Sequence, residues 1–274
     1  MPILYDLHMH SSFSPDSEAP MQSMAQEALR LGLHGICMTE HMDLDYPTQY
    51  FPAFEADPEL VYREVLRLRA HVSDHGFPLW IGFGLEFGMQ SHLSDRFSEL
   101  ASRFPLDFII ASQHLVDSLD PYYPETWENS KPEDLIDRYY HEMLANLKKM
   151  KEWDTLGHLD YIIRYIPGAG QHAYDSMARH GAVIDEILRY VIACGKCLEV
   201  NTASYHYGFG QPHPTPDILH RYHALGGRLL TIGSDAHRPE HIAYAFDRTL
   251  ALLRSVGFSS YCVFEGRSMR TIQF

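Results

Sequence analysis

The feature that most constrains the fold is the regular alternation of short apolar runs with longer stretches of helical periodicity. Runs of this length suit buried parallel strands, and the alternation is typical of repeated βα units. It predicts seven strands, at residues 3–8, 35–39, 79–85, 108–112, 155–158, 197–201 and 228–233. We therefore expect an α/β fold around a parallel, barrel-like sheet.

The stretches between the predicted strands have the pattern of helices that cover a sheet. Residues 61–72 and 184–191 each carry a single apolar stripe at helical spacing, which indicates packing against the core. Prolines and glycines mark expected helix ends, with Pro20 and Pro239 near starts and Gly32 and Gly226 just after ends. Irregular segments at residues 43–58, 117–132 and 205–216 follow strands, on the side that carries the chemistry in barrel enzymes.

Bulk properties narrow the class of protein. A chain of 274 residues, 45% of them hydrophobic, can bury one large core, so residues 1–274 are expected to form a single domain. No run of about 18 uncharged apolar residues is present, which favours a cytoplasmic protein. A net charge of −14 argues against nucleic-acid or membrane partners. The four cysteines predict no disulfide framework, and Cys197 is expected to be buried, with redox or metal work as the alternative.

Histidines and carboxylates recur where the predicted strands end. Alternation along the first strand places Asp6, His8 and His10 on one face. A single His-x-His pair is a weak signal. Further candidates end five other strands, namely Glu40 and His41, Glu86, His114, His158 and Asp160, and Asp235 and His237. Imidazole and oxygen ligands that converge from separate strands are what a cluster of cations needs, so the pattern predicts a metal site.

Several motifs in order carry a resemblance to a known family. They are Asp6-Leu7-His8-Met9-His10-Ser11, Thr39-Glu40-His41, Gly84-Leu85-Glu86, Ser112-Gln113-His114, Gly157-His158-Leu159-Asp160-Tyr161, Glu199-Val200-Asn201-Thr202 and Gly233-Ser234-Asp235-Ala236-His237. On these motifs, which run through nearly the whole chain, the protein resembles the polymerase-and-histidinol-phosphatase (PHP) superfamily. Within it, the single-domain histidinol-phosphate phosphatases are the most similar group.

The resemblance implies a distorted (β/α)7 TIM-like barrel that holds three divalent or transition-metal ions. Its ligands fall on His8, His10, Glu86 and Asp235 for one ion, on Glu86, His114 and His158 for a second, and on Asp16, His41 and His237 for a third. Glu86 then bridges two ions, because a carboxylate has two oxygens. Such mixed ligands accept Zn, Fe, Mn or Co. Asp16 lies in a predicted loop, where a helix-capping role is the alternative.

Three further residues are expected to support the site. Asp6 lies on the same strand face as His8 and His10, so its carboxylate is expected to accept the outer N–H of a ligating imidazole. Arg164 is the predicted phosphate clamp, because a guanidinium matches phosphate oxygens, with a surface ion pair as the alternative. Where many relatives carry Arg or Lys, this chain has His206, which either binds phosphate as a protonated imidazole or is an exposed loop residue.

These expectations lead to a metal-dependent phosphomonoesterase that acts on a small phosphorylated substrate. Two cations would generate a bridging hydroxide held by Glu86 and Asp235, and His237 is a candidate proton donor. The resemblance places L-histidinol phosphate first among substrates, with another small phosphate ester or a nucleotide as the alternative. Carboxylates near the mouth, such as Glu40, Asp43 or Asp45, would suit a substrate ammonium.

Two other classes remain open. Amidohydrolase-like barrels, which cleave C–N or lactone bonds, also begin with His-x-His, but their bridging carboxylated lysine has no counterpart at residues 108–112 or 155–158. A non-catalytic or proofreading module is the other alternative, because related domains occur inside DNA polymerases; the complete set of candidate ligands and the lack of a basic groove favour a free-standing enzyme. The oligomeric state is not predicted.

Overall fold

The computed structural model describes residues 4–51, 53–128, 130–168 and 174–274. Seven parallel strands form one sheet in the order β1-β2-β4-β5-β6-β7-β8. They are β1 (Tyr5–Asp6), β2 (Gly35–Asp43), β4 (Trp80–Gly88), β5 (Phe108–Ser112), β6 (Thr155–Leu156), β7 (Cys197–Asn201) and β8 (Leu230–Gly233). Backbone bonds from Leu7 N to Ile232 O, 3.1 Å, and from Asp235 N to His8 O, 2.7 Å, join its two edges. The predicted barrel of seven parallel strands is confirmed.

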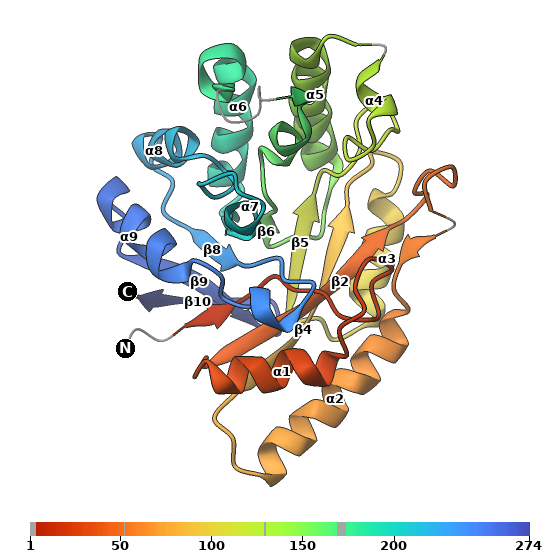
Figure 1. The fold of residues 1–274 in the computed structure, drawn as a ribbon, viewed down its shortest axis with the longest axis vertical. Helices are drawn as coiled ribbons and strands as arrows, with labels where there is room; N and C mark the ends of the chain where they lie inside the picture. Colours follow the sequence, from red (N-terminus) through yellow and green to blue (C-terminus); the bar gives the residue numbers. More distant parts are fainter. Residues whose placement is uncertain (1–3, 52, 129, 169–173) are drawn as a thin grey trace.

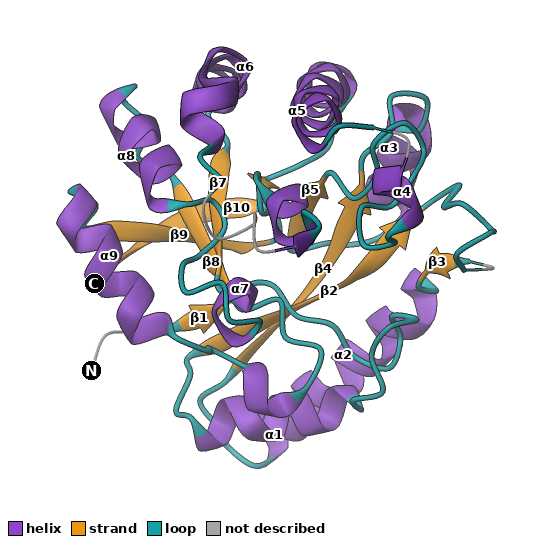
Figure 2. Ribbon diagram, turned by 45° about the horizontal axis from the view of Figure 1, so that its top comes forward, coloured by secondary structure: helices purple, strands orange, loops and turns teal. Residues whose placement is uncertain are grey.

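Helices surround the strands, as Figure 2 shows. The α-helices are α1 (Met21–Arg30), α2 (Pro58–Asp74), α3 (Ser94–Arg103), α4 (Glu125–Glu128), α5 (Pro132–Lys149), α6 (Ser176–Ala193), α7 (Ala203–His206), α8 (Pro216–Ala224) and α9 (Phe246–Val256), and η1 (Tyr161–Tyr165) and η3 (Pro239–His241) are 3-10 turns. The predicted stripes of α2 and α6 are buried, as expected from their apolar spacing. Within the described ranges, no helix has the length and apolar character needed to span a membrane.

Some predicted boundaries differ from the structure. Strand β2 continues four residues past the predicted end, through Asp43, because its ladder with β4 runs on to Met42 and because β3 (Phe54–Glu55) pairs antiparallel with Met42 and Asp43. The prediction that Pro239 stands near the start of the last helix is wrong: Pro239 begins η3, and α9 starts at Phe246. Positive φ angles at Ala243 and Ala245 interrupt the helix between these points. Ile3, the expected start of β1, lies outside the described residues.

A hairpin that the sequence analysis did not predict closes one end of the barrel. It consists of β9 (Ser260–Glu265) and β10 (Ser268–Gln273), near the labelled C-terminus in Figure 1. The Gly266 N–H donates to Asp107 Oδ1 at 2.8 Å, and the Tyr5 N–H donates to the Tyr261 hydroxyl at 2.9 Å. Because Asp107 and Tyr5 stand at the amino ends of β5 and β1, the hairpin covers that end.

The opposite end of the barrel carries a cavity. Loops and short helices that follow the carboxyl ends of β2, β5, β7 and β8 surround a space of about 510 Å³. Its lining includes candidate ligands from several strands, together with aromatic side chains from the loops. The fold therefore brings the predicted strand-end residues to one place, as the carboxyl ends of barrel strands do in enzymes.

Candidate metal centre

Glu86, near the carboxyl end of β4, lies at the middle of the candidate site. Its Oε1 lies 3.2 Å from Nε2 of His114 and 3.1 Å from Nε2 of His158. The same oxygen lies 3.4 Å from Nε2 of His8, and the other oxygen lies 3.0 Å from Nδ1 of His41. One carboxylate thus faces imidazoles from four different strands or strand ends, all of them buried.

A second group joins β1 to the end of β8. The Nε2 atoms of His8 and His10 lie 3.1 Å apart. Asp235 Oδ1 lies 3.3 Å from His10 Nε2 and 3.6 Å from His8 Nε2. These three side chains offer donor atoms close enough to share one ion.

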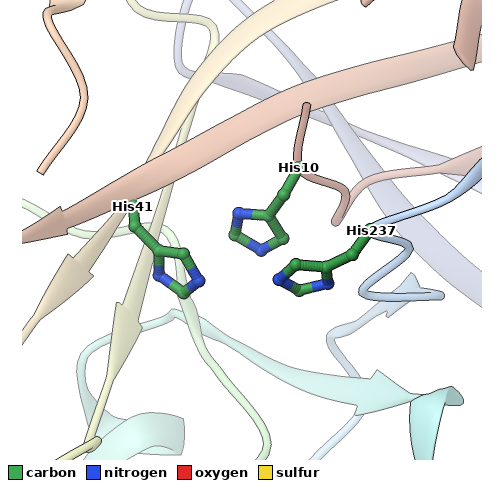
Figure 3. A group of neighbouring side chains, drawn as sticks. All are labelled: His10, His41 and His237. Atoms are coloured by element: carbon green, nitrogen blue, oxygen red, sulfur yellow. The ribbon is translucent and has the colours of Figure 1, made fainter. Parts of the chain in front are cut away.

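The third group lies nearer to solvent. Figure 3 shows the rings of His10, His41 and His237 turned toward one another, with His41 on β2 and the others on loops after β1 and β8. Asp16 adds a carboxylate, with Oδ2 2.9 Å from His237 Nε2 and 3.5 Å from His41 Nε2. The side chain of Asp16 therefore faces two imidazoles, as the metal prediction required, rather than a helix terminus. All nine predicted ligands belong to one connected cluster.

Hydrogen bonds on the outer side of two rings fix which ring nitrogen faces the site. His8 Nδ1 lies 2.6 Å from Glu199 Oε1, so this nitrogen donates its proton to the carboxylate. His10 Nδ1 lies 3.2 Å from the Ser14 hydroxyl, which donates its own proton to Glu40 at 2.6 Å and so accepts from His10. His10 Nε2 therefore carries a lone pair. Burial lowers the pKa of His8, but the carboxylates of Glu199, Glu86 and Asp235 raise it well above its usual value, so in the metal-free protein the His8 Nε2 proton faces His10 Nε2 across 3.1 Å. A cation bound there would take the place of that proton.

A similar arrangement orients His114. Its Nδ1 donates to Asp43 Oδ1 at 2.6 Å, which leaves Nε2 free to face Glu86. Asp6 does not act in the way predicted for it. Its carboxylate accepts from Ser234 and from the backbone N–H groups of Ser234 and Ala243, and no imidazole nitrogen contacts it among the described residues. The predicted bond to an imidazole N–H is made by Glu199 instead, because β7 faces His8 across the barrel.

The charges in the cluster are strongly coupled. Burial alone would raise the pKa of Glu86, but the imidazoles of His8, His114 and His41 hold it well below its usual range. Burial and the neighbouring His41 and His237 lower the pKa of His10 to about 3. Asp235, like Glu86, stays ionised at neutral pH because His8 and His10 lie beside it. Ionised carboxylates and a neutral imidazole are the protonation states that bind metals.

Buried polar atoms without hydrogen-bond partners provide a test of whether the residues suit metal ions. Among the described side chains these atoms include His41 Nδ1, Asp43 Oδ2, Glu86 Oε2 and His158 Nδ1. His41 Nδ1 lies 3.0 Å from Glu86 Oε2 and 3.2 Å from Asp43 Oδ2, but neither contact has hydrogen-bond geometry. Buried polar atoms without a hydrogen bond are costly, and metal coordination is a usual remedy. Three groups have donors within 4.8 Å of one another, namely His10, His41 and His237, then His8, His10 and Asp235, and lastly His41, Glu86 and His114. The residues therefore suit divalent metal ions.

Arg164, the predicted phosphate clamp, lines the same cavity from η1. Its guanidinium carbon lies 4.8 Å, 5.0 Å and 4.7 Å from the ring centroids of Tyr161, Tyr165 and Tyr207. Nη2 donates to the Tyr165 hydroxyl at 2.8 Å, and Nε is buried without a hydrogen-bond partner. No carboxylate forms an ion pair with Arg164 in the described ranges, so the alternative of a surface ion pair is not observed. Its charge remains available to an anion in the cavity.

His206 also lines the cavity, at the end of α7, and its ring stacks on His241 with centroids 3.9 Å apart. Both ring nitrogens are buried and lack hydrogen-bond partners. Burial and the nearby His241 lower the pKa of His206 to about 4. The imidazole is therefore neutral above mildly acidic pH in the free protein, which favours a neutral N–H donor over the protonated form considered from the sequence.

Sequence reasoning assigned no role to three residues of the site, namely Asp120, Glu199 and His241, and it gave Asp43 another role, as a carboxylate for a substrate ammonium. Asp43 and Glu199 orient ring nitrogens, whereas Asp120 and His241 line the cavity. Glu199 stands two residues before Asn201 on β7, so strand alternation was a usable signal that Glu199 faces the barrel interior. Asp120 and His241 lie in segments where no strand pattern indicated direction.

Comparison with known proteins agrees with this geometry. A family model described as the PHP domain matches residues 6–203. The histidinol-phosphatase of Lactococcus lactis subsp. lactis is 30% identical over 269 residues, which are 95% of this chain and 94% of that protein. A probable histidinol-phosphatase of Clostridium acetobutylicum is 28% identical, with 98% and 99% of the two chains covered.

Solved structures are similar as well. The crystal structure of histidinol phosphate phosphatase from Lactococcus lactis subsp. lactis, complexed with zinc, L-histidinol and phosphate, matches with a TM-score of 0.88 and 28% identity. The match covers 97% of this chain and 98% of that one. A putative histidinol phosphatase from Listeria monocytogenes has a TM-score of 0.74 at 17% identity, which shows the shared fold alone.

Proposed function

The chain belongs to the PHP domain family, and from this premise we propose that it hydrolyses L-histidinol phosphate to L-histidinol and phosphate with the help of bound divalent metal ions. The observation that carries the proposal is the convergence of imidazole nitrogens and two ionised carboxylates beside one cavity, which also holds an arginine without an ion pair among the described residues. The printed names and the complex of the Lactococcus lactis relative support the choice of substrate.

Nine residues are proposed to hold three ions, namely His8, His10, Asp16, His41, Glu86, His114, His158, Asp235 and His237. When bound, divalent ions supply a water of lowered pKa as nucleophile and neutralise charge on the phosphoryl oxygens. The protein's own part is to hold these side chains in place. Glu199 and Asp43 do so through 2.6 Å bonds to the outer nitrogens of His8 and His114.

The phosphate group is proposed to bind between the cluster and Arg164. The guanidinium is held by three tyrosine rings and keeps Nε unpaired, so it can donate to two phosphate oxygens without losing an ion pair. His206 is proposed to add a neutral N–H donor on the same wall of the cavity. Charge that spreads over the phosphoryl oxygens in the transition state would then be met by fixed donors.

A proton must reach the leaving alkoxide. His237 is the candidate donor, because its Nε2 lies 2.9 Å from Asp16 Oδ2 and its ring borders the cavity. Burial would lower the pKa of His237, but the carboxylate of Asp16 raises it above the usual histidine value in the metal-free protein. A nitrogen that binds the third ion has no proton to give, so His237 can act as the donor only while that ion is absent. The His237→Gln variant is expected to lower kcat more than it changes KM.

The substrate is tested by steady-state phosphate release from L-histidinol phosphate and from a panel of nucleotides and sugar phosphates. We expect the largest kcat/KM for L-histidinol phosphate. Hydrolysis of the panel alone would contradict the substrate and leave a phosphomonoesterase of another specificity. The cavity, at about 510 Å³, suits a small substrate.

Glu86→Gln provides the matched active-site control. It keeps the volume of the side chain but removes the charge that faces His8, His41, His114 and His158. We expect activity on every phosphoester to fall together with metal content. Wild-type turnover in this variant would exclude the proposed centre.

A further inference from the structure

The cavity beside the cluster of candidate metal ligands extends into a region that the proposed chemistry does not use. Its far wall is made by side chains of β3 and of the loops after β2 and β5, namely Tyr46, Phe51, Phe54, Asp120, Tyr122 and Tyr123. We call this wall the aromatic wall. The Phe54 ring lies 4.9 Å from the His41 ring, so the wall begins directly beside the cluster.

Asp120 is the one carboxylate of the described cavity lining that belongs to neither the cluster nor its hydrogen-bond partners. The residue is only 8% exposed. Oδ2 accepts from the Tyr46 hydroxyl at 2.5 Å, and Oδ1 accepts from the Tyr122 N–H at 2.7 Å. Both donors are neutral, and no lysine, arginine or histidine forms an ion pair with Asp120 in the part of the chain that the structure describes.

A buried carboxylate without a cation is costly. Burial raises the pKa of Asp120 above its usual range, and the hydrogen bond from Tyr46 opposes this increase. The backbone holds the carboxylate where it is, because the Thr126 hydroxyl and the Tyr123 N–H both donate to the Asp120 carbonyl. A positively charged ligand in the cavity would remove the cost, which makes the carboxylate a preformed recognition group.

The rings around Asp120 suit the same kind of ligand. Tyr46 and Phe54 have centroids 4.9 Å apart, and Tyr50 stacks on Tyr123 at 4.0 Å. Aromatic faces attract cations and stack on planar rings. A carboxylate with aromatic rings on several sides is therefore matched to an organic group that combines positive charge with a flat ring.

From this arrangement we propose that Asp120, aligned by Tyr46, binds a nitrogen of the substrate's organic half and so determines specificity. The inference rests on the proposed function, since L-histidinol phosphate carries both an ammonium and an imidazole. The ammonium and the imidazole each offer an N–H group that can donate to the Asp120 carboxylate. Phosphate at the metal cluster and nitrogen at the aromatic wall would bind the two ends of one molecule.

The carboxylates that the sequence suggested for an ammonium are less suited. Glu40 accepts from Ser11 and Ser14 and is not part of the cavity lining. Asp43 already accepts from His114. Asp45 is exposed outside the cavity lining and pairs with Arg96 and His92.

The test is the Asp120→Asn variant, assayed with metal-loaded full-length protein on four phosphate esters. These are L-histidinol phosphate, 3-(imidazol-4-yl)propyl phosphate without the ammonium, 2-aminopropyl phosphate without the ring, and propyl phosphate with neither. We expect kcat/KM for L-histidinol phosphate to fall about 10- to 100-fold, as loss of a hydrogen bond between charged groups does. Propyl phosphate should be hydrolysed as by the wild type. The analogue that still loses activity identifies the nitrogen that Asp120 binds.

Asp117→Asn is the matched control, because Asp117 lies in the same loop, outside the cavity lining, where it pairs with Arg138. It should leave all four substrates unchanged. An equal loss on all four substrates, or no loss on any, in Asp120→Asn would overturn the inference. If the wild type fails on L-histidinol phosphate, the proposed function is wrong, whereas the comparison of 2-aminopropyl with propyl phosphate still tests Asp120.

A second measurement covers the case in which the variant folds poorly. Tyr46→Phe leaves the charge of Asp120 in place and removes one donor to it. Inhibition by L-histidinol, measured with propyl phosphate as substrate, should weaken about 10-fold or more in Asp120→Asn and less than about threefold in Tyr46→Phe. Equal inhibition constants in wild type and Asp120→Asn would contradict the proposal.

Discussion

Arg164 offers the sharpest mutational test of the proposed phosphate site. Its guanidinium lies within 5.0 Å of three tyrosine ring centroids and forms no ion pair within the described chain. Arg164→Met removes the positive charge and all N–H donors of the guanidinium, but it keeps an unbranched apolar side chain beside the tyrosine rings. Two charge-assisted hydrogen bonds to phosphate contribute about 1.5–3 kcal/mol each, or about 3–6 kcal/mol together.

At about 1.4 kcal/mol for each tenfold change, this loss corresponds to about 10²- to 10⁴-fold in kcat/KM. Arg164→Lys keeps the charge but loses the bidentate geometry, so we expect an intermediate loss of about 10- to 100-fold. Tyr165→Phe removes only the hydroxyl that accepts from Nη2 at 2.8 Å. One such bond contributes about 1 kcal/mol, which predicts a loss of about fivefold.

The assay is phosphate release at several substrate concentrations, which separates kcat from KM, with thermal midpoint and metal content measured on the same preparations. The expected order of kcat/KM is wild type, Tyr165→Phe, Arg164→Lys and Arg164→Met. If Arg164→Met stays within threefold of the wild type while folded and loaded, Arg164 does not bind the phosphate.

Three further predictions concern the support of the cluster and of the fold. Glu199→Gln removes the charged acceptor of His8 Nδ1 and should weaken metal affinity about 10- to 100-fold in a chelator competition; unchanged affinity would contradict its orienting role. Gly233→Ala places a Cβ 2.3 Å from His8 Cβ and should lower the unfolding free energy, measured in urea, by about 1–3 kcal/mol. The control Gly181→Ala in α6 meets only Met177, at 3.5 Å, and should stabilise the protein slightly. Equal effects of the two substitutions would refute the packing argument. Arg267→Ala removes one of the two cationic partners of the buried Asp154 and leaves Lys196 at 3.7 Å, so it should lower the unfolding free energy by about 2 kcal/mol with kcat/KM of the folded enzyme unchanged. A loss of kcat/KM at full stability would show that the hairpin acts on the site.

The strand pattern predicted the barrel because parallel buried strands leave near-continuous apolar runs. The predicted bounds of β5 and β7 match the structure, and β4 differs by a few residues at its ends. The hairpin was missed for a physical reason. β9 carries a run of four buried residues, but in its partner β10 only Ile272 is buried, so β10 has almost no apolar signal from which a pairing could be predicted.

The candidate ligands were accessible to sequence reasoning because they stand at strand ends, where the topology of a barrel brings distant residues together. Their orienting partners were not. The contact of Glu199 with His8 depends on how β7 is placed relative to β1 in the barrel. The sequence of neither strand indicates which distant strand lies near it. The hydrogen bond to the outer ring nitrogen of a ligand histidine was therefore assigned to Asp6, which lies on the same predicted strand as His8. In the structure Asp6 accepts from Ser234 instead.

The aromatic wall could not be predicted from the sequence, for a related reason. Tyr46 and Asp120 are 74 positions apart in two irregular segments, and a loop has no periodicity from which a side-chain direction follows. Sequence reasoning instead placed the substrate ammonium at acidic residues next to the metal motif. The structure shows Glu40 and Asp45 already engaged by neighbours outside the cavity lining.

The most direct test of the central claim is a metal titration of chelator-stripped protein, verified as metal-free by elemental analysis, with phosphate release from L-histidinol phosphate as the readout. We expect no turnover in the stripped protein and recovery on addition of zinc or manganese, with saturation near three equivalents. Full turnover by the verified metal-free protein would contradict the claim that the cluster acts through bound metal ions.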